Sequence, residues 1–283
     1  MKLLKSTQIS RFALCLAFAA RLGAQTFIQM SDPQFGMYAK DQGFAHETLN
    51  FDFAIATANR LKPAFVVITG DLINKAGDAA QAAEYKRIAA KLDPGIKLFN
   101  VAGNHDVQNE PTKASLAAYR ERFGPDYYTF RIGDIAGFVL NSNLQKAPQN
   151  VPAEAADMES WLRGELAKAK SDGVKNLIVF QHIPYFLKFP EEADEYFNIP
   201  LETRRRYLKL FHEFGVRYVF TGHYHRNAGG TDGDLEMIVT GPVGMPLGEA
   251  RSGLRIATVS GNTVSHRYYD FGELPDSLTP AKQ

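Results

Sequence analysis

The feature that most constrains this chain is a regular alternation of short apolar runs with longer amphipathic segments after Gln25. The apolar runs are rich in Val, Ile, Phe and Leu and stop at glycine or polar residues, as buried strands do. The predicted strands of this kind are Thr26–Met30, Ala64–Thr69, Lys97–Val101, Asn176–Gln181 and Val216–Thr221. The predicted helices between them are Glu47–Leu61, Ala79–Leu92, Lys113–Phe123, Ala153–Lys170 and Glu202–Phe214. Strands separated by helices predict right-handed crossovers and a parallel core.

Further apolar runs follow one another in two blocks with no helical pattern inside either block. The first block is Tyr127–Ile132 and Ala136–Asn141, and the second is Leu235–Thr240, Leu254–Val259 and Thr263–Tyr269. Such meanders build antiparallel edges or a second sheet. Both patterns together predict an α/β fold in which two mixed sheets carry helices on their outer faces. No repeat or linker interrupts the pattern, so residues 25–283 are predicted to form a single domain.

The first 24 residues do not fit this pattern and resemble a secretory signal peptide. The basic residues Lys2, Lys5 and Arg11 precede a short apolar run at 12–20 and a small-residue exit at Gly23 and Ala24. This run is too short to span a bilayer. We expect cleavage after Ala24 and a secreted or periplasmic protein, with an uncleaved membrane anchor as the alternative. Because the only cysteine, Cys15, lies in this segment, the mature chain would have no thiol chemistry.

The overall charge gives no reason to expect a polyanionic partner. Thirty-two basic residues balance 31 acidic ones, for a formal charge of +1. We therefore predict no nucleic-acid binding and no stable membrane association after signal cleavage. Any preference for phosphate must come from a local site. The oligomeric state stays open.

Polar residues follow every strand of the predicted parallel core. They are Asp32, Gly70-Asp71, Gly103-Asn104-His105-Asp106, His182 and Gly222-His223-Tyr224-His225. In open α/β sheets the carboxyl ends of the strands share the edge where the binding crevice forms. Each cluster alone has a structural interpretation, as a turn, a helix cap or a buried core histidine. Their convergence on one edge favours a functional site.

The residue types in these clusters are those of a metal site without thiolates. The candidate ligands are Asp32, Asp71, Asn104, His182, His223 and His225. Carboxylate, amide oxygen and neutral imidazole suit hard or borderline divalent ions. Six ligands are too many for one tetrahedral zinc ion, and they suit two ions roughly 3.5–4 Å apart that share a carboxylate.

The same ordered motifs resemble those of the calcineurin-like metallophosphoesterases over about residues 26–240. They are Asp32-x-Gln34, Gly70-Asp71, Gly103-Asn104-His105-Asp106, His182 and Gly222-His223-x-His225. Within that family, the stretches 31–36, 180–184 and 222–230 are similar to the calcineurin-like phosphoesterase domain-containing protein 1 branch. The resemblance implies a four-layer αββα sandwich, which agrees with the alternation of strands and helices.

The resemblance also implies a role for each ligand. One ion would be held by Asp32, Asp71 and His225, and the other by Asp71, Asn104, His182 and His223. Asp71 would bridge the two ions. His105 would lie beside the leaving-group oxygen as a general acid or as a cationic stabiliser of the transition state. The ions would be two of Mn²⁺, Fe²⁺/Fe³⁺, Zn²⁺ or Mg²⁺.

Two positions depart from the family pattern. Gln34 stands where the wider family has histidine, and a neutral amide is a weaker ligand than imidazole, so we predict a first site that is either weak or filled by a harder ion such as Mn²⁺ or Mg²⁺. Asn74 stands where some members have an aspartate, and we expect its side chain to orient His105 or to contact substrate. Arg226, beside the histidine pair, is a candidate clamp for the substrate phosphate.

Three functions are consistent with these residues. The first is hydrolysis of a phosphomonoester by attack of a dimetal-bound hydroxide on phosphorus, and the resemblance implies a Ser/Thr phosphoprotein phosphatase. Because the chain is expected to be exported, a small organic phosphate is an equally good substrate. The second is hydrolysis of a phosphodiester, in a cyclic nucleotide or a lipid head group. The third is a catalytically lapsed module that binds phosphate or metal, which the presence of Gln34 suggests.

Outside these motifs, Lys188–Pro200 is an acidic and aromatic segment that follows the strand and His182 at its end. We predict a lid over the ions, with a pocket walled by Tyr185, Phe186, Tyr196 and Phe197. The arginines 204–206 open a helical pattern and are predicted to form a solvated face. A structural role is expected for His46, His212, His266 and Trp161.

Overall fold

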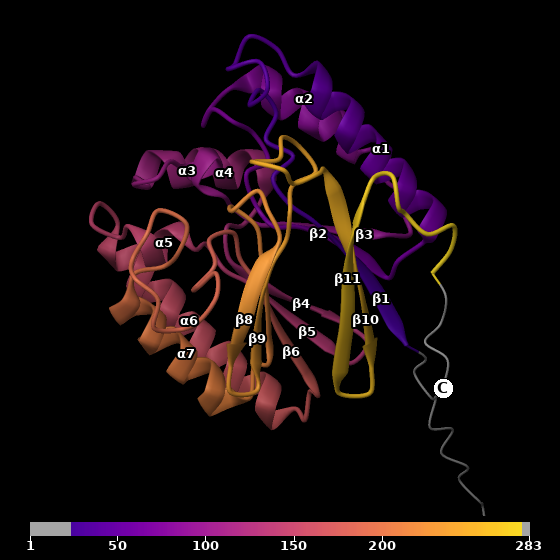
Figure 1. Ribbon diagram of the computed structural model, residues 1–283. Helices are drawn as coiled ribbons and strands as arrows, with labels where there is room; N and C mark the ends of the chain where they lie inside the picture. The colour runs from indigo at the N-terminus through magenta and orange to yellow at the C-terminus, as the bar shows by residue number, and fades with distance from the viewer. Residues whose placement is uncertain (1–23, 279–283) are drawn as a thin grey trace, which may run out of the picture.

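The computed structural model describes residues 24–278 and contains two β-sheets packed face to face, with helices on both outer faces (Figure 1). The strands of the first sheet are β1 (Gln25–Met30), β2 (Phe65–Ile68), β3 (Lys97–Asn100), β10 (Gly253–Ser260) and β11 (Thr263–Asp270). The strands of the second sheet are β4 (Tyr128–Ile132), β5 (Ile135–Val139), β6 (Asn176–Phe180), β7 (Tyr218–Thr221), β8 (Ala228–Asp232) and β9 (Leu235–Val239).

Both sheets are mixed. The first has the order β11-β10-β1-β2-β3, in which β1, β2 and β3 are parallel and β10 runs antiparallel to both β1 and β11. The second has the order β4-β5-β6-β7-β9-β8, with four parallel central strands and antiparallel edges at β4 and β8. The prediction of two mixed sheets in a four-layer αββα sandwich is confirmed.

The helices form the two outer layers. They are α1 (Ala45–Leu61), α2 (Ala79–Ala89), α3 (Asn104–Val107), α4 (Lys113–Phe123), α5 (Asn143–Lys146), α6 (Pro152–Ser171) and α7 (Leu201–Phe214). Helices α1 and α2 lie along the first sheet, while α6 and α7 lie along the second (Figure 1). Phe51 of α1 and Tyr85 of α2 stack on each other in the first of these layers, with ring centroids 5.2 Å apart.

The space between the sheets is filled by aromatic side chains. Along β1 successive residues point to opposite faces, so Phe27 enters the space between the sheets while Ile28 packs toward the helices. The Phe27 ring lies 4.8 Å from that of Phe65, 5.7 Å from that of Phe180 and 5.2 Å from that of Phe220. These rings join the two sheets directly beneath the strand ends that carry the polar clusters.

Some elements were not predicted. Strand β8 contains Gly229 and Gly230, which are poor strand formers. A Cβ at Gly230 would lie 2.1 Å from the carbonyl oxygen of Lys188, so the strand accepts glycine because another backbone passes close to it. The one-turn helices α3 and α5 are too short to give a periodic signal.

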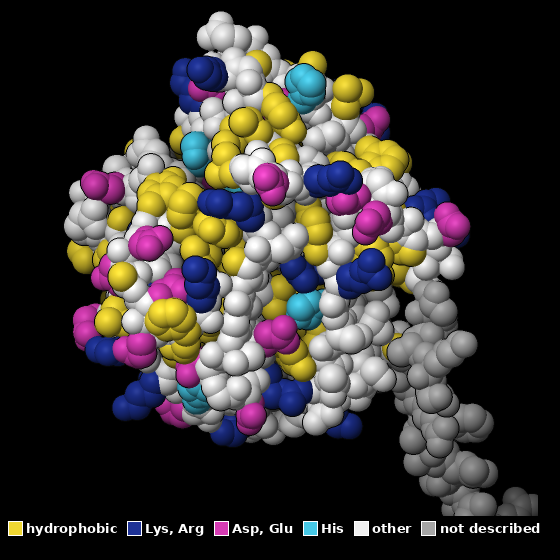
Figure 2. Space-filling view, viewed as in Figure 1, with side chains coloured by type: hydrophobic (Ala, Val, Ile, Leu, Met, Phe, Trp, Pro, Cys, Tyr) yellow, Lys and Arg dark blue, Asp and Glu magenta, His cyan; other side chains and the backbone are white. Residues whose placement is uncertain are grey.

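The predicted signal peptide, residues 1–24, lies outside the described residues except for Ala24. Among residues 24–278, no helix combines the length and the apolar character that crossing a lipid bilayer requires. On the face seen in Figure 2, basic and acidic side chains are interspersed, and neither sign forms a continuous area.

The aromatic layer gives a test of what holds the two sheets together. We expect Phe180→Ala to lower the free energy of unfolding by about 3–5 kcal/mol, because a fully buried ring is replaced by a cavity between the sheets. Urea denaturation of the purified protein measures this loss. The control is Phe53→Ala, since that ring is 47% exposed, and the loss there should be clearly smaller. Equal losses in the two variants would contradict this account of the core.

Candidate metal centre

The polar clusters lie in tight turns that directly follow the strands, as predicted. The described chain has nine non-glycine residues with positive φ. Five of them are candidate ligands, with φ between 39° and 68°: Asp32, Gln34, Asp71, His223 and His225. Side chains with a Cβ adopt this conformation at a cost in free energy, and such strain concentrates at functional sites. These five residues therefore keep strained backbone conformations, and the strained turns direct their side chains toward one place.

Two glycines allow these turns to pack against each other. A Cβ at Gly103 would lie 2.1 Å from the backbone nitrogen of Asp71, and a Cβ at Gly222 would lie 1.7 Å from the Oγ of Ser31. Contacts that short do not occur between real atoms. Glycine at 103 and 222 is thus required to bring the turns after β3 and β7 against those after β2 and β1.

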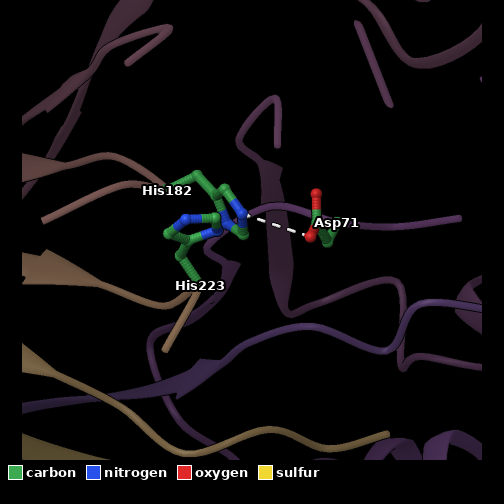
Figure 3. Close-up of side chains that lie close together, drawn as sticks. All are labelled: Asp71, His182 and His223. Atoms are coloured by element: carbon green, nitrogen blue, oxygen red, sulfur yellow. Dashed lines mark ion pairs between the residues drawn. The ribbon is translucent and has the colours of Figure 1, made fainter. Parts of the chain in front are cut away.

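The candidate ligands form two groups that share one carboxylate. Asp71, His182 and His223 have ligand atoms within 4.8 Å of one another, and so do Asp32, Asp71 and His225. All five side chains are buried. Figure 3 shows the first group, with the imidazole of His182 directed at the carboxylate of Asp71. The Nε2 atom of His182 lies 3.2 Å from the Oδ2 atom of Asp71. Asp71 therefore occupies the position of a bridge.

The three histidines are held in the orientation that metal ligands require. In each imidazole one ring nitrogen lies within hydrogen-bond distance of a backbone carbonyl oxygen, which fixes the tautomer and leaves the other nitrogen as an acceptor. The distances are 2.8 Å from His182 Nδ1 to Thr69, 2.6 Å from His225 Nδ1 to Met245, and 3.3 Å from His223 Nε2 to Tyr196. The free nitrogens are therefore Nε2 of His182 and His225 and Nδ1 of His223.

Asp32 presents one carboxylate oxygen to the site. Its Oδ2 accepts a hydrogen bond from the Ser31 hydroxyl and another, 3.1 Å long, from the backbone N–H of His223. Its Oδ1 lies 3.3 Å from the Nε2 atom of His225. The same N–H lies 3.3 Å from Oδ1, but only Oδ2 also accepts from Ser31, so Oδ1 is the oxygen more available to a cation.

The amide of Asn104 is oriented in the same way. Its Nδ2 donates to the Oδ1 of Asn109 over 2.9 Å and to the hydroxyl of Tyr196 over 3.2 Å. Its Oδ1 is left facing the Nε2 of His182 at 2.9 Å. The oxygen of Asn104 therefore points at the same place as the free nitrogen of His182.

Gln34 contributes a buried oxygen without a protein partner. The side chain is almost fully buried, and its Nε2 donates to the Oδ1 of Asn74 over 3.1 Å. Among residues 24–278, no donor reaches the Oε1 of Gln34. An unpaired buried acceptor is costly unless an ion or a water molecule satisfies it. This arrangement fits the weak-ligand role that the sequence predicts.

Charge coupling between the ligands is strong. Burial by itself raises the pKa of Asp71, but the neighbouring histidines, His182 foremost, together outweigh it and hold that pKa below its ordinary value. Burial also opposes protonation of His182, yet Asp71 raises the pKa of His182 to about 9. Burial and the neighbouring His182 lower the pKa of His223 to about 3. The negative charge of Asp71 that raises the pKa of His182 would equally stabilise a bound cation.

These observations agree with a pair of divalent ions. Two clustered carboxylates and three tautomer-fixed imidazoles form the two groups, with the oriented amide oxygen of Asn104 beside His182 and the unpaired oxygen of Gln34 in the turn that follows Asp32. Chemically, the set matches borderline ions such as Mn²⁺, Fe²⁺ and Zn²⁺.

His105 lies at the rim of this site and is oriented differently from what the sequence predicted. Its backbone N–H donates to the Oδ1 of Asp71 over 2.8 Å, and its Nδ1 lies 2.7 Å from the backbone carbonyl oxygen of Asn74. The side chain of Asn74 instead donates to Asp41 and accepts from Gln34. The expectation that the Asn74 side chain orients His105 was wrong, because the main chain of the same residue does so.

Asp106 has a role that the sequence analysis missed. Its carboxyl group accepts hydrogen bonds from the backbone N–H groups of Leu72, Ile73 and Gly103. It thus ties the turn after β2 to the turn after β3, and both turns carry ligands. Burial and the nearby Asp71 raise the pKa of Asp106 to about 7. The motif contained this residue, but three backbone partners cannot be read from a sequence.

The segment 188–200 covers one side of the site. The ring of Tyr196 lies 5.0 Å from the imidazole of His223, and the ring of Phe197 lies 5.5 Å from it. These two residues line the site as predicted. Tyr185 and Phe186 do not, because both are fully buried and Tyr185 packs against Tyr207 in α7. For this pair, the predicted pocket wall is wrong.

Arg204 anchors this segment, contrary to the predicted solvated face. Its side chain is fully buried, and its guanidinium donates to the carbonyl oxygens of Pro190, Glu192 and Ile199. Arg205 and its neighbour Arg206 are exposed, as expected. Helix periodicity alone could not show that one arginine of three turns inward to satisfy a loop backbone.

Arg226 lies beside an aromatic ring at the rim. Its guanidinium carbon is 4.1 Å from the centroid of the Tyr224 ring, a cation–π contact. Tyr224 in turn packs on Phe197, with centroids 5.1 Å apart. The phosphate-clamp role of Arg226 stays a prediction.

Comparison with known proteins agrees with this geometry. The family model for calcineurin-like phosphoesterases matches residues 26–227. The chain belongs to the calcineurin-like phosphoesterase family. It is 37% identical over 265 residues to the serine/threonine-protein phosphatase CPPED1 of Bos taurus, covering 88% of this chain and 85% of the relative.

Solved structures show the same fold at lower identity. A dimetal phosphatase from Danio rerio superposes with a TM-score of 0.60 at 17% identity, covering 88% of this chain and 100% of that one. GAP50, the anchor in the inner membrane complex of Plasmodium, superposes with a TM-score of 0.66 at 13% identity, covering 88% and 85%. As a member of this family, the protein is a metal-dependent phosphoesterase, a hydrolase of phosphoric ester bonds.

The sharing of Asp71 predicts how ligand variants lose metal. His225→Ala should retain about one ion per chain, because only one ligand group is broken, whereas Asp71→Ala should lose both ions. Elemental analysis of protein loaded with Mn²⁺ and then desalted measures the ratio. The surface variant His212→Ala is the control and should keep the full content. Loss of both ions in His225→Ala, or of one only in Asp71→Ala, would contradict the shared-ligand arrangement.

Proposed function

We propose that this protein hydrolyses phosphomonoesters at a pair of divalent ions held by the ligands at the strand ends. The observation that carries the proposal is the carboxylate of Asp71, which belongs to both groups of ligand atoms. Two ions at that place would supply a water-derived nucleophile and would neutralise charge on the phosphoryl oxygens. Membership of the family supports the class of reaction.

The ligands divide between the ions as follows. One ion would be held by Asp32, Asp71 and His225, with the Oε1 of Gln34 as a weak fourth ligand. The other would be held by Asp71, Asn104, His182 and His223. Mn²⁺, Fe²⁺/Fe³⁺, Zn²⁺ and Mg²⁺ are all compatible with these oxygen and nitrogen donors.

His105 would act on the leaving group. Its Nδ1 is held by the carbonyl of Asn74, so its Nε2 is free to face a bound substrate. As an imidazolium it would give the Nε2 proton to the departing oxygen and keep the proton that it shares with the carbonyl. The contact from its backbone N–H to Asp71 fixes its distance from the ligand groups.

The proposed substrates are alkyl phosphomonoesters, with phosphoserine and phosphothreonine esters as the first class to test. Support comes from relatives named as serine/threonine-protein phosphatases that cover 88% of this chain. Small organic phosphates form the second class, because we also propose export of the protein through residues 1–24. Sequencing the N-terminus of the protein recovered outside the cytoplasm tests export, and a start at Met1 would overturn signal cleavage.

The first experiment asks whether turnover depends on metal. Residues 25–283 are stripped with chelator and assayed on an aryl phosphomonoester and on the matching diester, with and without Mn²⁺. Turnover should return with Mn²⁺, favour the monoester, and be absent in Asp71→Ala. A preference for the diester would replace this proposal with a phosphodiesterase. Metal binding without turnover of either ester would indicate a lapsed binding module.

A second prediction concerns His105. Replacing it with alanine should lower kcat by roughly 10²–10⁴-fold on an alkyl phosphate, the usual contribution of a general acid. The loss should be smaller on an aryl phosphate, whose leaving group needs less protonation. Metal content should not change, because the side chain belongs to neither ligand group. Equal losses on both substrates would show that His105 does not protonate the leaving group.

A further inference from the structure

A continuous line of buried polar side chains runs between the two sheets, below the candidate metal centre. The side chains are Ser31, Thr69, Gln29, Thr240 and Arg255, and each is at most 7% exposed. Gln29 lies in β1 directly opposite Arg255 in β10, and it points into the space between the sheets. Apart from Ser31, none of these residues belongs to the motifs of the family resemblance. A polar layer in an otherwise apolar interface is expensive unless every group is satisfied.

The hydrogen bonds that link these side chains to one another run from Arg255 toward Ser31. The Nε of Arg255 donates to the hydroxyl of Thr240 over 2.7 Å, and that hydroxyl donates to the Oε1 of Gln29 over 2.6 Å. The Nε2 of Gln29 donates to the hydroxyl of Thr69 over 3.0 Å, and Thr69 reaches the Oγ of Ser31 over 2.9 Å. Because an arginine can only donate, the Thr240 hydroxyl accepts from it and is left to donate to Gln29. The Thr69 hydroxyl also lies 3.2 Å from the carbonyl oxygen of Met30, which is longer than its contact with Ser31.

The line of hydrogen bonds ends on Asp32, one of the candidate metal ligands. The hydroxyl of Ser31 donates to the Oδ2 of Asp32, so its single hydrogen is used and its oxygen must accept from Thr69. A guanidinium at one end and a carboxylate at the other polarise the bonds between them in the same sense. The Oδ2 of Asp32 is thereby fixed, and Oδ1 is left toward His225.

Arg255 is also connected to His225, which belongs to the same ligand group as Asp32. Its Nη2 donates to the Oδ1 of Asn227 over 2.8 Å, and the same oxygen accepts from the backbone N–H of Gly241. Asn227 lies two residues after His225, in the turn that carries that ligand. One buried guanidinium is therefore connected both to Asp32 and to the turn of His225.

Two residues outside this line of hydrogen bonds hold Arg255 in place. Its Nη1 lies 2.9 Å from the Nδ1 of His266, and the Nε2 of His266 lies 3.1 Å from the Oε1 of Glu236. Burial lowers the pKa of Arg255 to about 10, so the side chain stays charged at neutral pH. His266, expected to be structural, is part of this anchor.

We propose that Arg255 is a positioning residue, which acts through the Thr240–Gln29–Thr69–Ser31 chain and through Asn227 to orient Asp32 and His225 for one ion of the pair. The inference rests on the proposed two-ion site. In this inference the two ions depend on different supporting residues. The line of hydrogen bonds ends on Asp32, whereas the imidazole of His182 is held by the carbonyl of Thr69. Arg255 touches neither substrate nor ion in this account.

The test compares Mn²⁺ binding isotherms of the full chain and its Arg255→Met variant, both stripped of metal. The variant should bind one Mn²⁺ with unchanged affinity and the other about 10–100-fold more weakly, as for other partners of metal ligands. Arg255→Lys, which keeps a donor and the charge, should recover part of that affinity. The matched control is Arg267→Met, since this arginine is largely exposed on the neighbouring strand β11 and should bind both ions normally.

The outcomes separate this inference from the proposed function. If the unaltered chain binds fewer than two ions, the two-ion site fails, and this inference fails with it. Two ions in the unaltered chain and unchanged binding in a folded Arg255→Met variant would overturn the positioning role alone. If Arg255→Met does not fold, Thr240→Val interrupts the same chain with a side chain of similar shape. The Thr240→Val variant should bind one of the two ions more weakly than the unaltered chain does. Unchanged affinity for both ions would overturn the inference.

Discussion

The carboxylate of Asp71 is the interaction on which the rest of the site depends. It accepts the backbone N–H of His105, faces the imidazole of His182, and belongs to both groups of ligand atoms. A buried carboxylate is stable only with compensating charge or donors. Here the neighbouring histidines lower the pKa of Asp71, so the group is anionic and ready to hold cations.

The fold supplies this arrangement through rigid strand ends. Aromatic rings lock the two sheets together, and the turns above them adopt strained backbone conformations at five candidate ligands. Glycines at 103 and 222 then let the turns touch. Partners behind the ligands, including backbone carbonyls and the hydroxyl of Ser31, fix which atom of each side chain faces the site. Such preorganisation is what metal sites and catalytic sites have in common.

Much of this could be predicted because it depends on local sequence. The alternation of strands and helices gave the two-sheet sandwich, and the position of Asp71 or His182 at the end of a strand placed each near the common edge. The resemblance of the ordered motifs added the pairing of ligands into two groups. The first two inferences require only the chain order and the geometry of parallel strands, whereas the pairing rests on the family resemblance.

What could not be predicted depends on contacts between distant segments. Arg204 has the same helical setting as Arg205, yet it turns inward because the loop before α7 has unpaired carbonyls. Strand β8 accepts two glycines because backbone passes close to each: that of Met237 beside Gly229 and that of Lys188 beside Gly230. The line from Arg255 to Asp32 joins residues in or directly after four strands, β1, β2, β9 and β10, of both sheets, and Gln29 or Thr240 alone has no distinctive sequence signal.

The central claim is that two ions share Asp71, and electron paramagnetic resonance of the Mn²⁺-loaded protein tests it most directly. Two Mn²⁺ ions joined by one carboxylate should give the multiline spectrum of an exchange-coupled pair. Asp71→Ala should lose that spectrum and show at most isolated ions. A spectrum of isolated, uncoupled Mn²⁺ in the unaltered protein at full loading would contradict the shared-carboxylate site.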